Sequence, residues 1–451
     1  MSTQDQPSST RDQPTSKRLA QTLRALGSRN FRLFFAGQTV SLVGTWIQQI
    51  AMSWLVYRLT GSAVMLGMVG FVGQLPGLVI TPFAGVAADR WNRHRMVIAT
   101  QTGAMLQALA LAALVLTGTV RVWHILALSA VVGIVNGFDV PARQAFLVEL
   151  VEDRDDLPNA IALNSSMFNG ARLIGPAIAG ALIAVVGEGV CFLINGLSYV
   201  AVLAALLAMR VPRRAVPTGR GNVLAELREG FRYGWSFPPV RTVLLFLALA
   251  SLIAQPYTVL MPVVATRVLH GGANTMGVLM AMTGLGALTG ALYLAGRASV
   301  VGLGRVIARA GTLFGLALIG VAWSRSVWLS CVLLVLAGLG MMVHAAGSNT
   351  MLQTLAEDRM RGRVISLYTL AFLGTAPLGS LYAGLVAQRL GAPATIGIGG
   401  AATLVGAAFF FRQLPMMRRH VWPLYRRMGI LPEVASGLGT ATEYMHPPEQ
   451  Q

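Results

Sequence analysis

Two charged side chains within long apolar runs have the clearest chemical potential in the sequence. Asp139 lies near the inner end of the fourth run, and Arg172 lies within the fifth. A charge that faces lipid is costly, so both should face the interior of the helix assembly or a water-filled cavity. They could pair with each other as a structural clamp, or line a cavity that binds a polar solute. The sequence leaves both interpretations open.

Polar, uncharged side chains and one histidine also interrupt the apolar runs. Three of them, separated by seven and four positions, share one face of the first predicted helix. Each amide could equally form a hydrogen bond that fastens two helices together. We take the whole set, with Asp139 and Arg172, as candidates for a substrate cavity: Gln38, Thr45, Gln49, Gln74, Asn136, Asn169, Gln255 and His344.

A short polar segment between the second and third runs contains an acid followed by a cluster of arginines. Its charged residues and the glycine before them are Gly85, Asp89, Arg90, Arg93 and Arg95. Two apolar runs joined by such a segment are typical of a cytoplasmic hairpin. Glycine one turn before the acid lets another helix approach closely. We expect Asn92 to adopt positive φ in the turn, which asparagine tolerates.

A second motif lies around Arg172, where small residues and a proline recur within one run. It comprises Gly170, Gly175, Pro176 and Gly180. Small residues at such spacing allow close helix packing in a membrane. The proline frees a backbone carbonyl and bends the helix.

The motifs of common enzyme classes are absent from the sequence. It has no His-Glu-x-x-His, no Gly-x-Ser-x-Gly and no phosphate-binding Gly-x-x-x-x-Gly-Lys-Ser/Thr. Cys191 and Cys331 lie in separate apolar runs without metal-ligand spacing. We therefore predict neither an enzyme nor a cofactor nor a metal. The energy for any transport must come from an ion or substrate gradient.

The composition is that of a membrane protein. Of 451 residues, 55% are hydrophobic and 12% are charged, where a soluble domain carries about 25% charged residues. The net charge of +18 could suggest a nucleic-acid partner, but the arginines fall in short clusters between apolar runs. We therefore expect membrane lipids, and not nucleic acid, to contact the basic residues after the last run.

Twelve apolar runs follow one another, most of them long enough to cross a bilayer. A polar linker with a short amphipathic helix from Val223 divides them into two sets of six. The runs are 33–57, 64–88, 96–117, 122–142, 161–186, 190–209, 242–266, 275–296, 303–323, 327–348, 364–388 and 393–411. The predicted domains are an N-terminal tail (1–30), a six-helix bundle (31–209), the linker (210–241), a second bundle (242–412) and a C-terminal tail (413–451).

The distribution of arginine and lysine predicts the orientation. With both termini inside, five of the 35 basic residues lie in outer loops and Arg172 lies deep within a run, which leaves 29 in the cytoplasmic tails and loops and at the inner ends of runs. Cytoplasmic loops carry the excess of positive charge in membrane proteins. We therefore expect both tails to be cytoplasmic.

The polar segment at Gly85 resembles the loop between helices two and three of the major facilitator superfamily. That loop reads Gly-x-Leu-Ala-Asp-Arg-x-Gly-Arg-Arg, and here Ala87 replaces the leucine and Asn92 the glycine. The resemblance implies an all-α membrane protein of twelve helices in two six-helix bundles around a central cavity. It also implies that Asp89 meets Arg361 and Arg363, which flank the start of the eleventh run, when the cytoplasmic side closes.

Further segments are similar to the branch that contains the enterobactin exporter and macrolide-efflux relatives. They include Asn30-Phe-Arg, Asn159-Ala-Ile-Ala-Leu-Asn and Arg172-Leu-Ile-Gly-Pro. This resemblance implies export of a siderophore, drug or similar metabolite across a bacterial inner membrane, in exchange for protons. We expect the transporter to act as a monomer. Facilitation or import is the alternative within transport, and a non-transporting sensor or scaffold lies outside it.

One departure from the superfamily bears on proton coupling. Many proton-coupled exporters carry an arginine midway along helix four, whereas Gly133 stands at that position here. The first run also has no acid. Both features argue against proton coupling through those two sites.

Overall fold

The computed structural model describes residues 24–151, 153–210, 223–297, 299–357 and 359–427, and for residues 82, 85–90, 154, 223–227 and 427 it describes the backbone alone. Every regular element within these ranges is helical. The main helices are α2 (Arg29–Thr60), α3 (Ala63–Arg90), α4 (Arg93–Leu116), α5 (Val122–Leu147), α6 (Leu157–Ala208), α7 (Val223–Ser236), α8 (Pro238–Leu249), α10 (Ala273–Ala295), α11 (Leu303–Trp323), α12 (Val327–Leu355), α13 (Arg361–Thr369), α14 (Ala376–Leu390) and α15 (Ala392–Arg427).

Ten helical segments of the described chain are long and apolar enough to cross a membrane. One of them, α6, spans 52 residues and consists of two helices that meet at Gly187, where φ is 79° and ψ is 173°. Glycine adopts this conformation without the steric cost that a Cβ would bring. The 32-residue α2 is not among the ten. The chain is thus an all-helical, multi-pass membrane protein, as its composition predicts.

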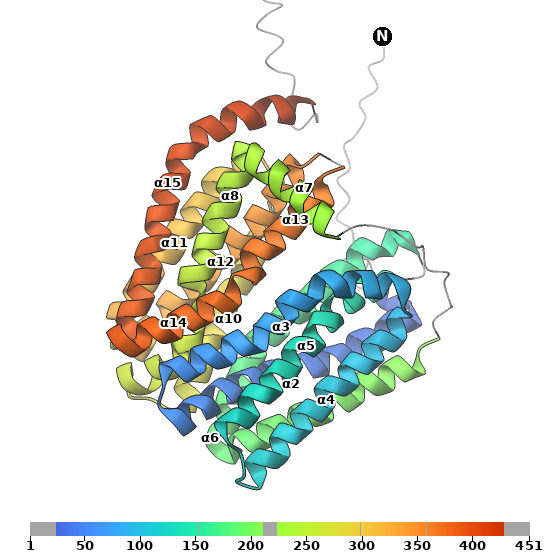
Figure 1. Cartoon of the computed structure of the whole chain (residues 1–451), viewed down its shortest axis with the longest axis vertical. Coiled ribbons are helices and arrows are strands. Elements are labelled where there is room, and N and C mark those ends of the chain that lie inside the picture. The colour runs from blue at the N-terminus through green and yellow to red at the C-terminus, as the bar shows by residue number, and fades with distance from the viewer. Residues whose placement is uncertain (1–23, 152, 211–222, 298, 358, 428–451) are drawn as a thin grey trace, which may run out of the picture.

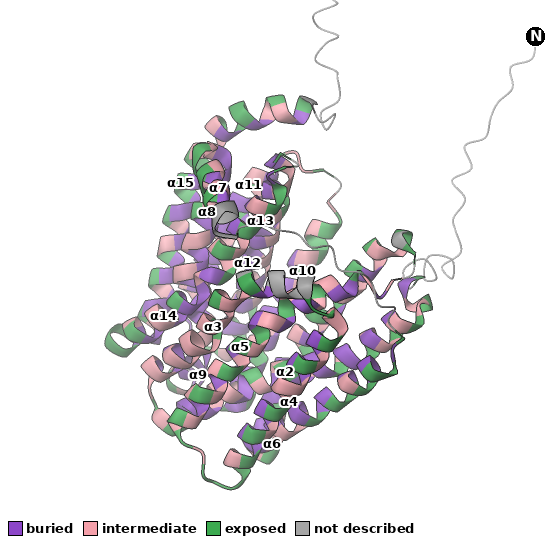
Figure 2. Cartoon of the chain, turned by 45° about the vertical axis from the view of Figure 1, so that its right-hand side comes forward, coloured by how far each residue is buried: buried purple, intermediate pink, exposed green. Residues whose placement is uncertain are grey.

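Exposed residues lie along the outer faces of the helices (Figure 2), and many of them are large and apolar. Trp323 and Trp328 are each 84% exposed, and Val405 is 71% exposed. In water such a surface would favour aggregation. Against lipid tails it carries no such penalty, so the exposed apolar faces fit a bilayer.

The helices form two groups that are consecutive in the sequence. Figure 1 shows α2 to α6 packed together on one side and α8 to α15 on the other. We call them the first and second helix groups. The linker helix α7 lies between them in the sequence.

Two helix pairs join the groups, and the first pair is α3 with α14. A Cβ added to Gly67 would lie 2.5 Å from the carbonyl oxygen of Ser380, and one added to Gly384 would lie 3.0 Å from the Cα of Gly67. Only small residues permit this approach of two backbones. Gln74 Nε2 also donates a hydrogen bond to Ser380 Oγ at 3.3 Å.

The second pair is α6 with α10. A Cβ on Gly180 would lie 2.9 Å from both the carbonyl oxygen of Ala273 and the Cα of Gly277. Nearby, Arg267 donates a hydrogen bond to the carbonyl oxygen of Gly61 at 3.2 Å. These contacts lie at the end of the molecule where α2 ends and α3 and α10 begin. From this joined end the two groups diverge toward the opposite end (Figure 1).

The seventh apolar run is not one regular helix. After α8 it continues as a π-helical turn, η3 (Ala250–Ala254), a 3-10 turn, η4 (Gln255–Leu260), one turn of α-helix, α9 (Met261–Val263), and a further π-helical turn, η5 (Val264–Val268). Pro256 and Pro262 lie in this stretch and cannot donate backbone hydrogen bonds. The irregular backbone is covered by protein, which is the condition under which a membrane protein tolerates it.

The amphipathic linker helix is present as α7 and packs against the start of α13. Arg363 Nη1 lies 2.7 Å from Glu229 Oε1 in an ion pair between the two helices. A Cβ on Gly230 would lie 3.1 Å from the Cβ of Arg363. Asn222, which directly precedes this helix and is predicted from its residue type to cap it, lies outside the described residues.

The close approach at Gly180 generates a test of what holds the joined end together. Gly180→Leu should overfill the contact at a cost of about 1–3 kcal/mol and thereby open this end. A cysteine at Met276, which is 1% exposed, should become reactive toward a membrane-impermeant maleimide in a background that lacks Cys191 and Cys331.

Gly170→Leu is the matched control, because a Cβ at Gly170 would meet nothing within 4 Å. This variant should leave the labelling unchanged. A folded Gly180→Leu protein whose Met276→Cys thiol stays unreactive would show that these glycines do not close the joined end.

Candidate functional site

Arg172 lies between the two helix groups and rests on an aromatic ring. Its guanidinium carbon is 6.0 Å from the centroid of the Trp46 ring on α2. Phe168, one turn before Arg172, packs edge-on to the same ring at 6.0 Å. Gly175 makes room for Trp46, since a Cβ there would lie 2.4 Å from the Trp46 Cβ. The helix-five motif therefore brings a cation and two aromatic rings together.

The second helix group completes the surroundings of Arg172. The guanidinium interacts electrostatically with the phenol of Tyr257 in η4, and that hydroxyl lies within hydrogen-bonding reach of Thr283 on α10. The backbone of Arg172 is close as well, because a Cβ on Gly284 would lie 2.9 Å from its carbonyl oxygen. Arg172 thus lies where α2, α6, α10 and the irregular seventh segment meet.

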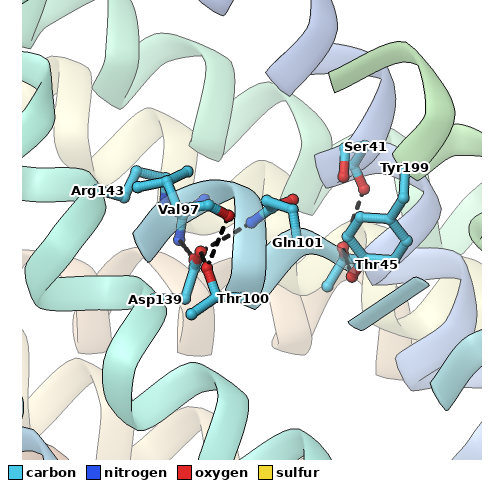
Figure 3. Close-up of polar contacts among 8 residues, drawn as sticks. All are labelled: Ser41, Thr45, Val97, Thr100, Gln101, Asp139, Arg143 and Tyr199. Atoms are coloured by element: carbon cyan, nitrogen blue, oxygen red, sulfur yellow. Dashed lines mark hydrogen bonds and ion pairs between the residues drawn. The ribbon is translucent and has the colours of Figure 1, made fainter. Parts of the chain in front are cut away.

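Asp139 has partners other than Arg172. Its carboxylate lies 3.3 Å from Nη2 of Arg143, one turn further along α5. It also accepts hydrogen bonds from Thr100 Oγ1 at 2.7 Å and Gln101 Nε2 at 2.8 Å, both on α4. Figure 3 shows the four side chains converging. With Asp139 only 3% exposed, this cluster fastens α4 to α5.

The clamp between Arg172 and Asp139, one of the two readings of the sequence, is therefore not formed in this structure. Across the described parts of the chain, no carboxylate forms an ion pair with Arg172. The sequence did contain the signal for the true partner, because Asp139 and Arg143 are four residues apart and so face each other on a helix. We had not included Arg143 among the site residues.

Several amides of the first helix group form hydrogen bonds between helices. Asn195 donates to Gln48 Oε1 at 2.8 Å, and Gln48 donates to Gln107 at 2.9 Å. The hydroxyls of Thr45 and Tyr199 lie 3.3 Å apart (Figure 3). Gln38 is buried, and its Oε1 has no hydrogen-bond partner.

The remaining uncharged candidates differ in exposure. Gln49, Asn136 and Gln74 are exposed, whereas Asn169 and Gln255 are half-buried. Asn169 donates to the carbonyl oxygen of Ser165, which leaves its own side-chain oxygen available. Gln255 lies in η4, two residues before Tyr257. Gln74, in contrast, is engaged with α14 through Ser380.

His344 lies away from any exposed face, contrary to its inclusion among the cavity residues. It is fully buried on α12, and its ring packs edge-on to Phe246 of α8 at 4.4 Å. Neither ring nitrogen has a hydrogen-bond partner in the structure.

The arginine-rich segment connects α3 to α4. Gly85, Asp89 and Arg90 end α3, and their side chains lie outside the described residues. Arg93 forms an ion pair with Glu149 at 2.9 Å, and Arg95 is exposed. Asn92 has a φ of −67° and caps α4 by accepting a hydrogen bond from the Arg95 backbone. The expectation of positive φ at Asn92 is wrong, because the residue serves as a helix cap.

Arg361 and Arg363 begin α13, and Arg363 forms an ion pair with Glu229 of α7. We expected Arg363 to face the end of α3. In this conformation it faces the linker helix. Among the residues that the structure describes, no three histidine, cysteine or acidic side chains are grouped to hold a metal ion.

Comparison with known proteins gives the family. Residues 20–427 match the family model described as a transmembrane secretion effector, within the major facilitator superfamily. The chain belongs to this family. Its members and relatives are transporters and not enzymes.

The chain is similar over most of its length to several characterised transporters. It is 28% identical to the staphyloferrin A transporter of Staphylococcus aureus, over 84% of this chain and 95% of the relative. It is 29% identical to the multidrug efflux pump Tap of Mycolicibacterium fortuitum, over 80% and 90% respectively. Macrolide efflux protein A of Streptococcus pyogenes is 23% identical over the same shares.

Solved structures of transporters share the fold. The nucleoside transporter NupG aligns with a TM-score of 0.67 at 12% identity, over 86% of this chain and 98% of that one. A bacterial homologue of the iron transporter ferroportin, in an inward-facing state, aligns with a TM-score of 0.65 at 16% identity, over 85% and 98%. The resemblance to the superfamily seen in the sequence is confirmed.

The contacts of Asp139 predict which arginine it depends on. Double-mutant cycles should give a coupling of about 0.5–3 kcal/mol between Asp139→Asn and Arg143→Gln, because the two residues are direct partners. Thermal or denaturant unfolding of purified protein in detergent measures it.

Arg172→Gln combined with Asp139→Asn is the matched control, and its effects should add within about 0.5 kcal/mol. If the pair 139/172 were coupled and the pair 139/143 were not, the assignment of partners would be wrong.

Proposed function

We propose that the protein is a secondary exporter that works by alternating access in a bacterial inner membrane. Twelve spans would arise from the ten apolar segments, with α6 counted as two and α2 added. The arginine distribution supports cytoplasmic termini. The two helix groups act as the two moving bundles, and the proposed unit is a monomer.

With this orientation the joined end of the molecule is the outer end. In the proposed cycle, the contacts of α3 with α14 and of α6 with α10 close the outside, and the ends at which the two groups diverge (Figure 1) face the cytoplasm. An exporter binds its substrate from this state. Rocking one group against the other would then release the substrate outside.

The observation that carries the proposal is the unpaired charge of Arg172. A cation at this depth is costly unless an anion, water or a ring compensates it. Trp46 provides a ring on one side, and no carboxylate of the described chain pairs with it. The compensating anion is the substrate in our proposal, held by charge-assisted hydrogen bonds from the guanidinium and by stacking on Trp46 and Phe168.

The proposed substrate is therefore a small amphipathic molecule with a carboxylate or similar anionic group. Siderophores and drugs, named for the similar transporters, are the classes in which we place it. Gln255, Asn169 and Gln49 are the proposed polar contacts around the anion. Protons are the proposed coupling ion, taken up as the substrate leaves.

Replacement of Arg172 tests the substrate class. In inside-out vesicles, the wild type should accumulate carboxyfluorescein, an anionic amphipathic probe, in preference to rhodamine 6G, a cationic one. Arg172→Gln should lower carboxyfluorescein uptake about tenfold or more, since the lost charged hydrogen bonds contribute about 1.5–3 kcal/mol.

Arg172→Lys is the control that keeps the charge, and it should retain part of the uptake. Undiminished uptake by a well-folded Arg172→Gln protein would refute the role of Arg172. Uptake that survives collapse of the proton gradient but follows the probe gradient would indicate a facilitator.

The ion pair between Arg363 and Glu229 predicts a second effect. We propose that Arg363 leaves Glu229 and meets Asp89 when the cytoplasmic side closes, so that the two acids compete for it. Glu229→Gln should favour the outward-facing state and Asp89→Asn the inward-facing state. With side chains 26% and 40% exposed, the pair contributes about 0.2–1 kcal/mol, and the population should shift at most about fivefold.

The rate at which a cysteine at Gly362 is alkylated from the cytoplasmic side reports the population. It should fall in Glu229→Gln and rise in Asp89→Asn. Shifts in the same direction for both variants would exclude the competition.

A further inference from the structure

A large cavity lies at the end of the second helix group, apart from the divide between the groups. It measures about 760 Å³, is open on one side, and is lined by the start of α11, the residues just before it, Met351 of α12 and the last part of α15. Apolar side chains such as Val301, Leu414 and Val421 form most of its wall. No step of the proposed transport cycle uses this cavity.

Three arginines line the same cavity: Arg305 at the start of α11, and Arg418 and Arg419 on α15. All three are exposed. The cavity has no acidic residue in its lining, and none of the three arginines forms an ion pair with any residue that the structure describes. The cavity thus combines an apolar wall with three uncompensated positive charges.

Aromatic residues complete the arrangement. The Arg418 guanidinium stacks on the ring of Trp422 at 4.3 Å, and Tyr425 also lines the cavity. Stacking occupies a face of the guanidinium and leaves its N–H edge free to donate hydrogen bonds. Tryptophan and tyrosine are enriched where a protein crosses from lipid tails to headgroups. The cavity therefore lies at the depth of the headgroups.

The position of the cavity in the fold agrees with access from lipid. Helices α11 and α15 lie on the side of the second helix group that faces away from the first (Figure 1). Here α15 continues past its apolar part to Arg427 and contains Pro415 and Pro423. Under the proposed orientation, on which this placement rests, the cavity opens to the cytoplasmic leaflet.

We propose that this cavity is a binding site for one anionic phospholipid. Its phosphate accepts hydrogen bonds from Arg305, Arg418 and Arg419, and an acyl chain lies along the apolar wall. Arginine is suited to this role because its planar fork donates two parallel hydrogen bonds to a phosphate. Basic pockets among membrane helices on the cytoplasmic side bind lipid headgroups in this way.

The chemistry of the wall favours a lipid over a soluble phosphate. An inorganic ion would fill a small part of 760 Å³ and would leave the apolar surface in contact with water. A phospholipid covers both parts of the site. The transported substrate is a poorer fit, because the cavity does not communicate with Arg172 through any lining residue.

Lipid retention by the purified full-length protein tests the site. The protein is exchanged into detergent with equal amounts of dioleoyl phosphatidylglycerol and dioleoyl phosphatidylcholine, and bound lipid is counted by native mass spectrometry. The wild type should retain one phosphatidylglycerol with about tenfold preference. Combined Arg305→Gln, Arg418→Gln and Arg419→Gln should reduce this preference to near unity.

The matched control removes three other exposed arginines from the same end of the group: Arg309→Gln, Arg412→Gln and Arg426→Gln. None of these lines the cavity, so the preference should persist. An equal loss in the control would show a diffuse charge effect and overturn the site. Equal retention of both lipids by the wild type would also overturn the site. Displacement of the lipid by inorganic phosphate at a concentration on the order of 10 mM would overturn it as well, because it would indicate a site for a soluble ion.

These outcomes are separate from those of the transport proposal. Lipid retention is measured without substrate and does not depend on Arg172. A protein that fails to transport carboxyfluorescein can still retain the lipid. A protein that shows no lipid preference can still transport carboxyfluorescein.

Discussion

The arrangement of the molecule depends on the close approach of backbones at small residues. Gly67 meets Gly384, and Gly180 meets Gly277, at distances that leave no room for a side chain. Such contacts have no hydrophobic driving force in lipid and depend on packing alone. They can therefore separate without exposing large apolar surfaces to water. In the proposed transport cycle, such contacts would hold one state and could be exchanged for those of another.

That constraint sets the position of Arg172. The glycines that flank it bring α6 against α10 and Trp46 against α6, and the guanidinium is left between the two helix groups with a ring for a neighbour and no carboxylate. Asp139, the acid that could have neutralised it, is satisfied by Arg143 and α4. In our proposal, an anionic substrate stabilises this charge, and its binding is thereby linked to the contact region of the two groups.

The helices and the family could be predicted from the sequence, because long apolar runs and a charged hairpin are local signals. The partners of the charges could not, since they depend on which helices become neighbours. No pattern in the linker sequence distinguishes Glu229 from its neighbours. Its contact with Arg363 forms because α7 packs on α13. His344 was misplaced because polarity in a run does not give the direction in which the side chain points. The irregular turns around Pro256 could not be predicted, because the apolar composition of this run suits a regular helix equally well.

The most direct measurement locks the joined end and asks which side can still reach the site. The Cβ of a residue at Gly70 lies 2.9 Å from the Cβ of Ser380, so cysteines at both positions need a shift of about 0.6 Å to form a disulfide. In a background without Cys191 and Cys331, a third cysteine at Gln49 reports access to a membrane-impermeant reagent. After oxidation, we predict that Gln49→Cys reacts only from the cytoplasmic side, and from both sides once the disulfide is reduced. Reaction from the outside in the oxidised protein would contradict the account.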